Sequence, residues 1–196
     1  MKHLALHTCC APCLIGVHSV LAAEADHITV VFYNPNIAPS FEYSKRRNAC
    51  EEYARDKGIR FFEITPSDDW TEAQSQIDVS SLSAIQLSLE EQREMRCRTC
   101  YDLRLGRVAV WAIEHGCDGL ATTLSISPFQ NIATINQIGE AKIAAFCDIN
   151  FIAADFREHH RDAQRMARHL GIYCQNYCGC LPSKAEAAKQ RADRKR

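Results

Sequence analysis

The chain has 196 residues, and its 23 lysines and arginines nearly balance 24 aspartates and glutamates, for a formal net charge of −1. Its 46% hydrophobic and 24% charged residues are typical of globular proteins, which excludes a disordered, collagen-like or low-complexity chain. No apolar stretch approaches the ~20 residues of a membrane-spanning helix, and no signal-peptide pattern is present. We expect a soluble, cytoplasmic protein with one domain over residues 1–183 and a basic tail, helical or frayed, over residues 184–196.

Short apolar runs alternate with stretches of helical periodicity along the chain. The predicted strands are 3–8, 28–33, 59–64, 119–124 and 150–154, and the predicted helices between them are 13–25, 41–57, 100–115 and 132–146. The polar stretch 65–89, with helix caps at Asp68 or Asp69 and at Ser88, predicts a helical insertion. This alternation predicts a single α/β domain with a parallel sheet of about five strands flanked by helices.

Four of the predicted strands are followed directly by loops that carry sulfur or polar groups. These are Cys9 and Cys10 after the first strand, Tyr33 and Asn34 after the second, residues 125–131 after the fourth, and Asp155 and Arg157 after the fifth. Ligands of parallel sheets bind beyond the carboxyl ends of the strands. We therefore expect these loops to converge on one edge of the sheet and to form the functional site there.

Eleven cysteines are too many for background use in a chain of this length. An odd number without an export signal argues against a secreted disulfide scaffold. The cysteines cluster at Cys9, Cys10 and Cys13, at Cys97 and Cys100, and at Cys178 and Cys180. The middle pair lies at the start of a predicted helix, where the helix dipole favours thiolates. An iron–sulfur cluster, a zinc site and a thioredoxin-like dithiol at Cys10 and Cys13 all remain open at this point.

Other polar and sulfur-bearing residues have a simpler interpretation. Cys50, Cys117 and Cys147 stand alone in the sequence, and we expect them to be small buried hydrophobic residues. Arg46 and Arg47 are expected on a solvated helix face.

Six motifs together resemble the cobalamin-independent epoxyqueuosine reductases, the QueH family. They are CCAPC at 9–13, YNPNI at 33–37, RCRTCYDLRL at 96–105, TTLSISP at 122–128, ADFR at 154–157 and QNYCGC at 175–180. The resemblance covers nearly the whole chain. It implies a HUP-like α/β fold, an iron–sulfur cluster, and the reduction of epoxyqueuosine to queuosine at the wobble position of tRNA, the last step of queuosine biosynthesis.

The resemblance also implies roles for individual cysteines. Carried over to the matching positions, the ligands of a [4Fe-4S] cluster are Cys9, Cys10, Cys97 and Cys100. The remaining pair, at positions 178 and 180, is then either redox-active or binds a second, mononuclear iron, and the sequence leaves this choice open.

Reduction of an epoxide to an alkene removes one oxygen as water and needs two electrons and two protons. Asp155 is the predicted proton donor, with Tyr33 in reserve. Tyr33, Asn34 and Arg157 are expected to bind the substrate, and the pair Cys178 and Cys180 to take part in the chemistry. An external electron donor must complete the cycle. The oligomeric state is not predicted.

Two alternatives from other functional classes stay open on the residues alone. One is a thiol–disulfide oxidoreductase that uses Cys10 and Cys13, and the other is a zinc-stabilised RNA-binding module. A net charge near zero argues against general affinity for RNA. Contacts with tRNA are therefore expected to be local, through the arginines around Cys97 and the basic tail.

Overall fold

The structure, a computed structural model, describes residues 1–66, 70–72 and 87–194. Five strands form one sheet in the order β3-β2-β1-β4-β5, and all neighbouring pairs are parallel. The strands are β1 His3–Thr8, β2 His27–Phe32, β3 Arg60–Glu63, β4 Gly119–Thr122 and β5 Asn150–Phe151. This order is that of a doubly wound fold, so the predicted α/β class with a parallel sheet is confirmed.

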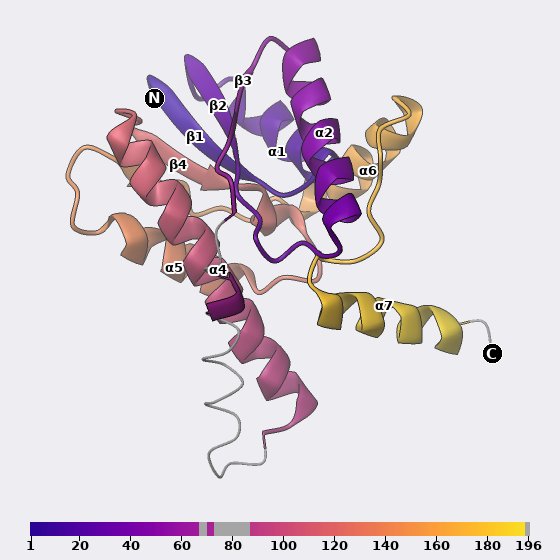
Figure 1. Ribbon diagram of the computed structural model, residues 1–196. Coiled ribbons are helices and arrows are strands. Elements are labelled where there is room, and N and C mark those ends of the chain that lie inside the picture. Colours follow the sequence, from indigo (N-terminus) through magenta and orange to yellow (C-terminus); the bar gives the residue numbers. More distant parts are fainter. Residues whose placement is uncertain (67–69, 73–86, 195–196) are drawn as a thin grey trace.

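Helices cover both faces of the sheet (Figure 1). On one face lie α1 Ala11–Leu21, α2 Ser40–Asp56 and α6 His160–His169, and on the other lie α4 Leu89–Glu114 and α5 Ile132–Ile143. The last helix, α7 Leu181–Asp193, lies at the carboxyl end of the chain. Side chains alternate along β1: Leu4 and Leu6 pack in the core with α1, and Ala5 packs in the core with α4. Every helix in the described part of the chain is too short or too polar to span a lipid bilayer.

The predicted strands differ from the observed ones mainly at their carboxyl ends. The fourth strand was expected to continue to residue 124, but it ends at Thr122 and turns into a 3-10 helix, η1 Thr123–Ile126. The Thr122 hydroxyl causes this turn by accepting a hydrogen bond from the backbone N–H of Leu124 at 3.1 Å. Most of the predicted insertion, with the caps Asp68 and Asp69, lies outside the described residues.

Helices α1 and α6 approach each other closely at Gly16. A Cβ atom added to Gly16 would lie 2.3 Å from Ile126 Cδ1 and 2.8 Å from the Cβ of Ala163. Ala163 and Ala167 are both buried in this contact between helices. A glycine is therefore needed here so that α6 can lie beside the first turns of α1, which carry a group of cysteines.

We predict that Gly16→Ala lowers the free energy of unfolding by about 1–3 kcal/mol, because overpacking forces α1 and α6 apart. Urea-induced unfolding measures this change. Gly106→Ala in α4 is the matched control, since the three heavy atoms nearest to its added Cβ all belong to the flexible Lys142 side chain. That control should match the wild type or gain up to ~1 kcal/mol from helix propensity. Equal effects of the two substitutions would contradict the close-approach account.

Candidate active site and metal centre

Cys9, Cys10 and Cys13 form a compact group of thiols between β1 and α1. Cys10 is the N-cap of α1, and Pro12 lies in its first turn, where the missing N–H costs nothing. The three Sγ atoms lie within 4.8 Å of one another, and those of Cys9 and Cys10 are 4.0 Å apart. All three side chains are buried. The turn therefore presents three sulfur atoms together at a helix N-terminus, whose dipole favours thiolates.

The three thiols of this turn differ in acidity. Hydrogen bonds from Cys10 and Cys13 hold the pKa of Cys9 well below its usual value, against the opposing effect of burial. Burial raises the pKa of Cys10, and hydrogen bonding with Cys10 and Cys9 raises that of Cys13. Cys9 is therefore the most acidic of the three thiols, and its sulfur also lies 3.8 Å from the Thr123 hydroxyl.

Cys97 and Cys100 reach the site from α4, but they do not lie at its start. The helix begins at Leu89 and is capped by Ser88, whose hydroxyl accepts from the Glu91 N–H while the Glu91 carboxylate accepts from the Ser88 N–H. The predicted helix start at Cys100 is therefore wrong by about three turns. The helix dipole gives this pair no help, and burial raises the pKa of Cys100 to about 11.

Arg104 supplies positive charge to the site in place of the helix dipole. Its side chain is buried, and it donates hydrogen bonds to Cys100 Sγ at 3.6 Å and to Asn34 Oδ1 at 2.6 Å. Asn34 in turn donates to the Thr8 carbonyl at 2.8 Å. Burial opposes the charge of Arg104, but the sulfur atoms of Cys100 and Cys9 more than compensate and raise its pKa. Arg104 thus joins α4 to the ends of β1 and β2.

The third cysteine cluster lies on the loop that precedes α7. Gln175 on this loop donates a hydrogen bond to Cys10 Sγ at 2.8 Å. Arg46 of α2 holds the loop from the other side, because its guanidinium donates to the carbonyls of Tyr177 at 3.0 Å and Cys178 at 2.7 Å. Gly179 has a φ of 148°, a value that favours glycine. These contacts bring Cys178 to the segments that carry the other thiols.

A cavity of about 430 Å³ joins the three clusters. Its wall includes Cys9, Cys13, Cys97, Cys178 and Cys180, so sulfur atoms from three remote segments face one space. The cavity is formed by the segments that follow β1 and β4, by the loop before α7 and by side chains of α4, α6 and α7. It lies at the carboxyl edge of the sheet, where the sequence predicts the functional site. Of the four loops predicted to converge, those after β1 and β4 line the cavity, through Cys9 and through Ser127, Phe129 and Gln130.

Gln130 orders the part of the cavity around Cys178. The Tyr101 hydroxyl donates to Gln130 Oε1 at 2.5 Å, which fixes the orientation of the amide. The amide N–H group then points to Cys178 Sγ at 3.5 Å. Burial raises the pKa of Cys178 to about 12, with further contributions from Cys100 and Cys180. Cys178 is therefore a protonated thiol near neutral pH in the absence of metal.

The other predicted site residues lie outside the cavity wall. Tyr33 and Asn34 are 1% and 0% exposed, so they support the site from beneath and their positions do not favour direct contact with a substrate. Asp155 and Arg157 lie at the surface and form an ion pair. Hydrogen bonds from Arg157 lower the pKa of Asp155, which favours its ionised form. This geometry gives no support to Asp155 as a proton donor.

Two simpler expectations about single residues are also wrong. Arg46 is 1% exposed and pairs with Glu42 at 2.7 Å, instead of lying on a solvated helix face. Its importance could not be read from the sequence, because a Glu and an Arg four residues apart usually pair on a helix surface. Cys147 is exposed, since α5 ends at Ile143, whereas Cys50 and Cys117 are buried as predicted.

The donor set around the cavity fits a sulfur-ligated metal group. Thiols are soft ligands that suit iron–sulfur clusters and zinc. Within the described residues, the Nε atoms of Arg96 and Arg104 and the Oε1 atom of Gln175 are buried without a hydrogen-bond partner. Buried polar atoms without partners are rare in folded proteins, and these three belong to residues of the cavity wall.

Sequence comparisons find similar proteins that match nearly the whole chain. A family model described as "Epoxyqueuosine reductase QueH" matches residues 4–186. The epoxyqueuosine reductase QueH of Dehalococcoides mccartyi is 31% identical over 183 residues, which cover 93% of each chain. The protein of the same name from Thermotoga maritima is 32% identical over 200 residues, which cover 98% of this chain and 96% of its own.

A solved structure with a similar fold is the U34-tRNA thiolase NcsA from Methanococcus maripaludis with its [4Fe-4S] cluster. The TM-score is 0.54 at 12% identity, and the match covers 98% of this chain and 65% of the thiolase. At this identity the likeness concerns the fold alone. Together with the strand order, it confirms the expected HUP-like α/β fold.

We predict that Arg46→Lys lowers the free energy of unfolding by about 3 kcal/mol, because lysine cannot satisfy Glu42 and two loop carbonyls together. Hydrogen exchange should also become faster at residues 175–180. Arg47→Lys is the matched control on the same helix, since its ion pairs are partly exposed and worth at most ~1 kcal/mol. Similar losses of stability in the two variants would show that Arg46 does not hold the loop.

Proposed function

Because this chain belongs to the QueH family of epoxyqueuosine reductases, we propose that it is an oxidoreductase that converts epoxyqueuosine to queuosine at the wobble position of tRNA. The observation that supports this most is the cavity in which sulfur atoms from three remote segments meet. The chain matches epoxyqueuosine reductases over most of its length. This match favours the reductase over the two alternatives, the thiol–disulfide oxidoreductase and the zinc-stabilised RNA-binding module.

A [4Fe-4S] cluster is the cofactor that we propose for this cavity. Its ligands would be Cys9, Cys10, Cys97 and Cys100. The thiolase that shares this fold carries such a cluster, which supports the assignment. When bound, the cluster supplies electrons one at a time. The ligands of a four-iron cluster bind different irons, so Cys97 and Cys100 need not lie as close to Cys9 and Cys10 as the ligands of a single ion would.

The reaction itself sets what the remaining thiols must do. It breaks both C–O bonds of the epoxide, forms a C=C bond and releases the oxygen as water, which consumes two electrons and two protons. Cys178 and Cys180 together can provide both electrons and both protons when they form a disulfide. An external electron donor must then return two electrons, with two protons, to restore the thiols.

Cys178 takes the place of Asp155 as the proton donor in this proposal. Its thiol lines the cavity and keeps its proton near neutral pH, because burial raises its pKa to about 12. Gln130 orients the sulfur through its amide N–H. Asp155, by contrast, is exposed and held in its ionised form by Arg157.

A second, mononuclear iron is the alternative use of these thiols. Cys13, Cys178 and Cys180 line the cavity together with Cys9 and Cys97 of the proposed cluster ligands, so the sulfur atoms needed for one more iron are present. The two versions differ in their iron content. A cluster with a redox-active pair contains about four irons per chain, and a cluster with a second iron contains about five.

We predict that protein purified anaerobically is brown and contains about four irons and four acid-labile sulfides per chain. Cys97→Ser should lose most of this iron, because the cluster loses a ligand from α4. Cys178→Ala should keep the four irons but lose turnover of epoxyqueuosine in tRNA. Cys147→Ser changes an exposed cysteine and serves as the control that keeps both iron and turnover.

The same measurements separate the alternatives. Stoichiometric zinc, with tRNA binding but no turnover, would favour the RNA-binding module. Full activity after Cys97→Ala and Cys100→Ala would favour a dithiol mechanism at Cys10 and Cys13. A colourless, iron-free protein that still reduces epoxyqueuosine would refute the proposal.

A further inference from the structure

Phe129 is an exposed aromatic residue at the entrance of the cavity. Its side chain is 65% exposed although it belongs to the cavity wall. The residue follows η1, and its backbone carbonyl accepts a hydrogen bond from Arg93 at 3.4 Å, so α4 fixes its position. Next to it, Gln130 points inward to Cys178. Two adjacent side chains thus point in different directions: the ring of Phe129 faces outward, and the amide of Gln130 contacts the sulfur of Cys178.

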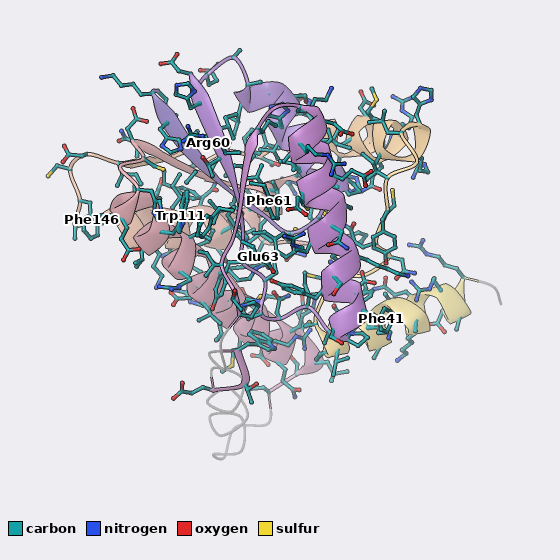
Figure 2. The ribbon with its side chains drawn as sticks, turned by 45° about the horizontal axis from the view of Figure 1, so that its top comes forward. Phe41, Arg60, Phe61, Glu63, Trp111 and Phe146 are labelled. Atoms are coloured by element: carbon teal, nitrogen blue, oxygen red, sulfur yellow. The ribbon has the colours of Figure 1, made fainter. Side chains whose placement is uncertain are left out.

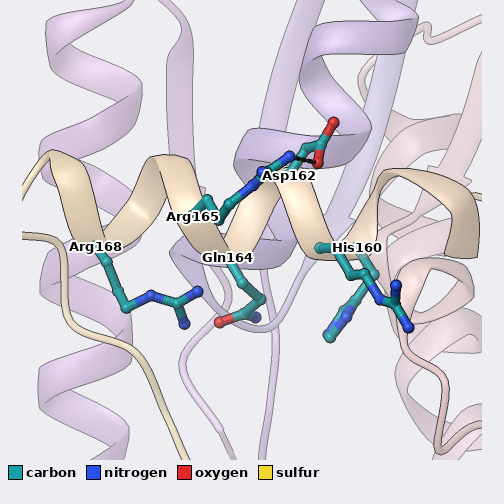
Figure 3. Close-up of a pocket in the computed structure, with 6 residues that line it drawn as sticks. His160, Asp162, Gln164, Arg165 and Arg168 are labelled. Atoms are coloured by element: carbon teal, nitrogen blue, oxygen red, sulfur yellow. Dashed lines mark hydrogen bonds and ion pairs between the residues drawn. The ribbon is translucent and has the colours of Figure 1, made fainter.

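Helix α6 forms another part of the entrance and carries positive charge. His160, Gln164 and Arg168 line the cavity, and they also line a groove of about 680 Å³ along the outside of α6. Figure 3 shows these three side chains on one side of the helix and the ion pair of Arg165 with Asp162 on the other. Within the described residues, Arg168 has no carboxylate partner.

The charge around the cavity favours an anionic ligand. Its wall holds four arginines, at positions 93, 96, 104 and 168, and one carboxylate, Glu186. Glu186 pairs with Arg96 at 2.6 Å and with Arg93 at 3.9 Å, so within the described residues Arg168 is the exposed arginine of the wall that has no acidic partner. An exposed aromatic ring beside a wall with an excess of positive charge is the combination by which proteins bind single-stranded nucleic acid.

We infer that the cavity entrance is a docking surface for a single-stranded RNA loop, on which Phe129 stacks with one nucleobase while Arg168 and His160 on α6 contact the phosphate backbone. This inference rests on the proposed function, since a base must leave its stack to reach groups deep in a cavity. The neighbouring base then loses a stacking partner, and the ring of Phe129 replaces it. The groove along α6 continues the path of the backbone away from the entrance.

Binding of a labelled anticodon stem–loop RNA to anaerobically purified protein, followed by fluorescence anisotropy at several salt concentrations, tests this surface. Phe129→Ala should weaken binding roughly tenfold, because one base loses its stacking platform. Phe129→Trp should retain binding within about twofold, because it keeps an aromatic face. Arg168→Glu should weaken binding and reduce the slope of log affinity against log salt by about one.

Two exposed residues at the opposite edge of the sheet provide matched controls. Phe146 is 47% exposed and precedes β5, on the opposite side of the molecule from α7 (Figure 2). Arg55 is 70% exposed near the end of α2. Phe146→Ala and Arg55→Glu should leave affinity and salt slope unchanged. Thermal unfolding verifies that every variant is folded, which is expected because all four changed side chains are largely solvent-exposed or line the open entrance.

The outcomes separate this inference from the proposed function. Wild-type affinity in both Phe129→Ala and Arg168→Glu would overturn the docking surface, even if the wild type reduces epoxyqueuosine in tRNA. Losses of RNA affinity in the two control variants as large as those in Phe129→Ala and Arg168→Glu would overturn it as well. So would the absence of RNA binding by the wild type. Selective losses at Phe129 and Arg168 in a protein that cannot reduce epoxyqueuosine would support the surface and refute the proposed function.

Discussion

The buried guanidinium of Arg104 is the interaction on which the site depends. It links α4 to the loop after β2 through Asn34, and Asn34 links that loop to the end of β1. A buried cation is costly unless anionic or strongly polar partners surround it. Here the partners are sulfur atoms, among them that of Cys100 at 3.6 Å. The arrangement is therefore most stable when nearby sulfurs carry negative charge, as metal-bound thiolates do.

The fold could be predicted from the sequence because its signals are local. Each apolar run became a strand at nearly the expected position, and β1 matches the predicted residues 3–8 at both ends. The predicted start of α4 at Cys100 is wrong, although Ser88 is a predicted helix cap. Residues 89–94 are all exposed, so this part of the helix carries no apolar face that could reveal it. The helix therefore begins well before the hydrophobic periodicity does.

The site was predictable only in part. The clustering of cysteines and their places after strands indicated which segments meet, since the carboxyl ends of parallel strands share one edge. The sequence gives no comparable indication of the direction in which an individual side chain points. Asp155 follows a strand as expected but turns outward to Arg157, and Asn34 turns inward to Arg104. Arg46 and Gln175 were missed as supports of the site because their contacts lie more than 100 residues away in sequence.

Placing sulfur atoms from three segments around one cavity serves both electron transfer and substrate access. Cys9 and Cys13 beside α1, Cys97 on α4, and Cys178 and Cys180 on the loop before α7 all lie in the cavity wall, where a substrate can approach them. Only the fold holds these segments together, because no short stretch of the chain contains all of the proposed ligands.

Iron K-edge X-ray absorption on the anaerobic protein tests this account most directly. We expect sulfur as the dominant ligand and a clear iron–iron distance; iron surrounded by nitrogen and oxygen, with no neighbouring iron, would contradict the account.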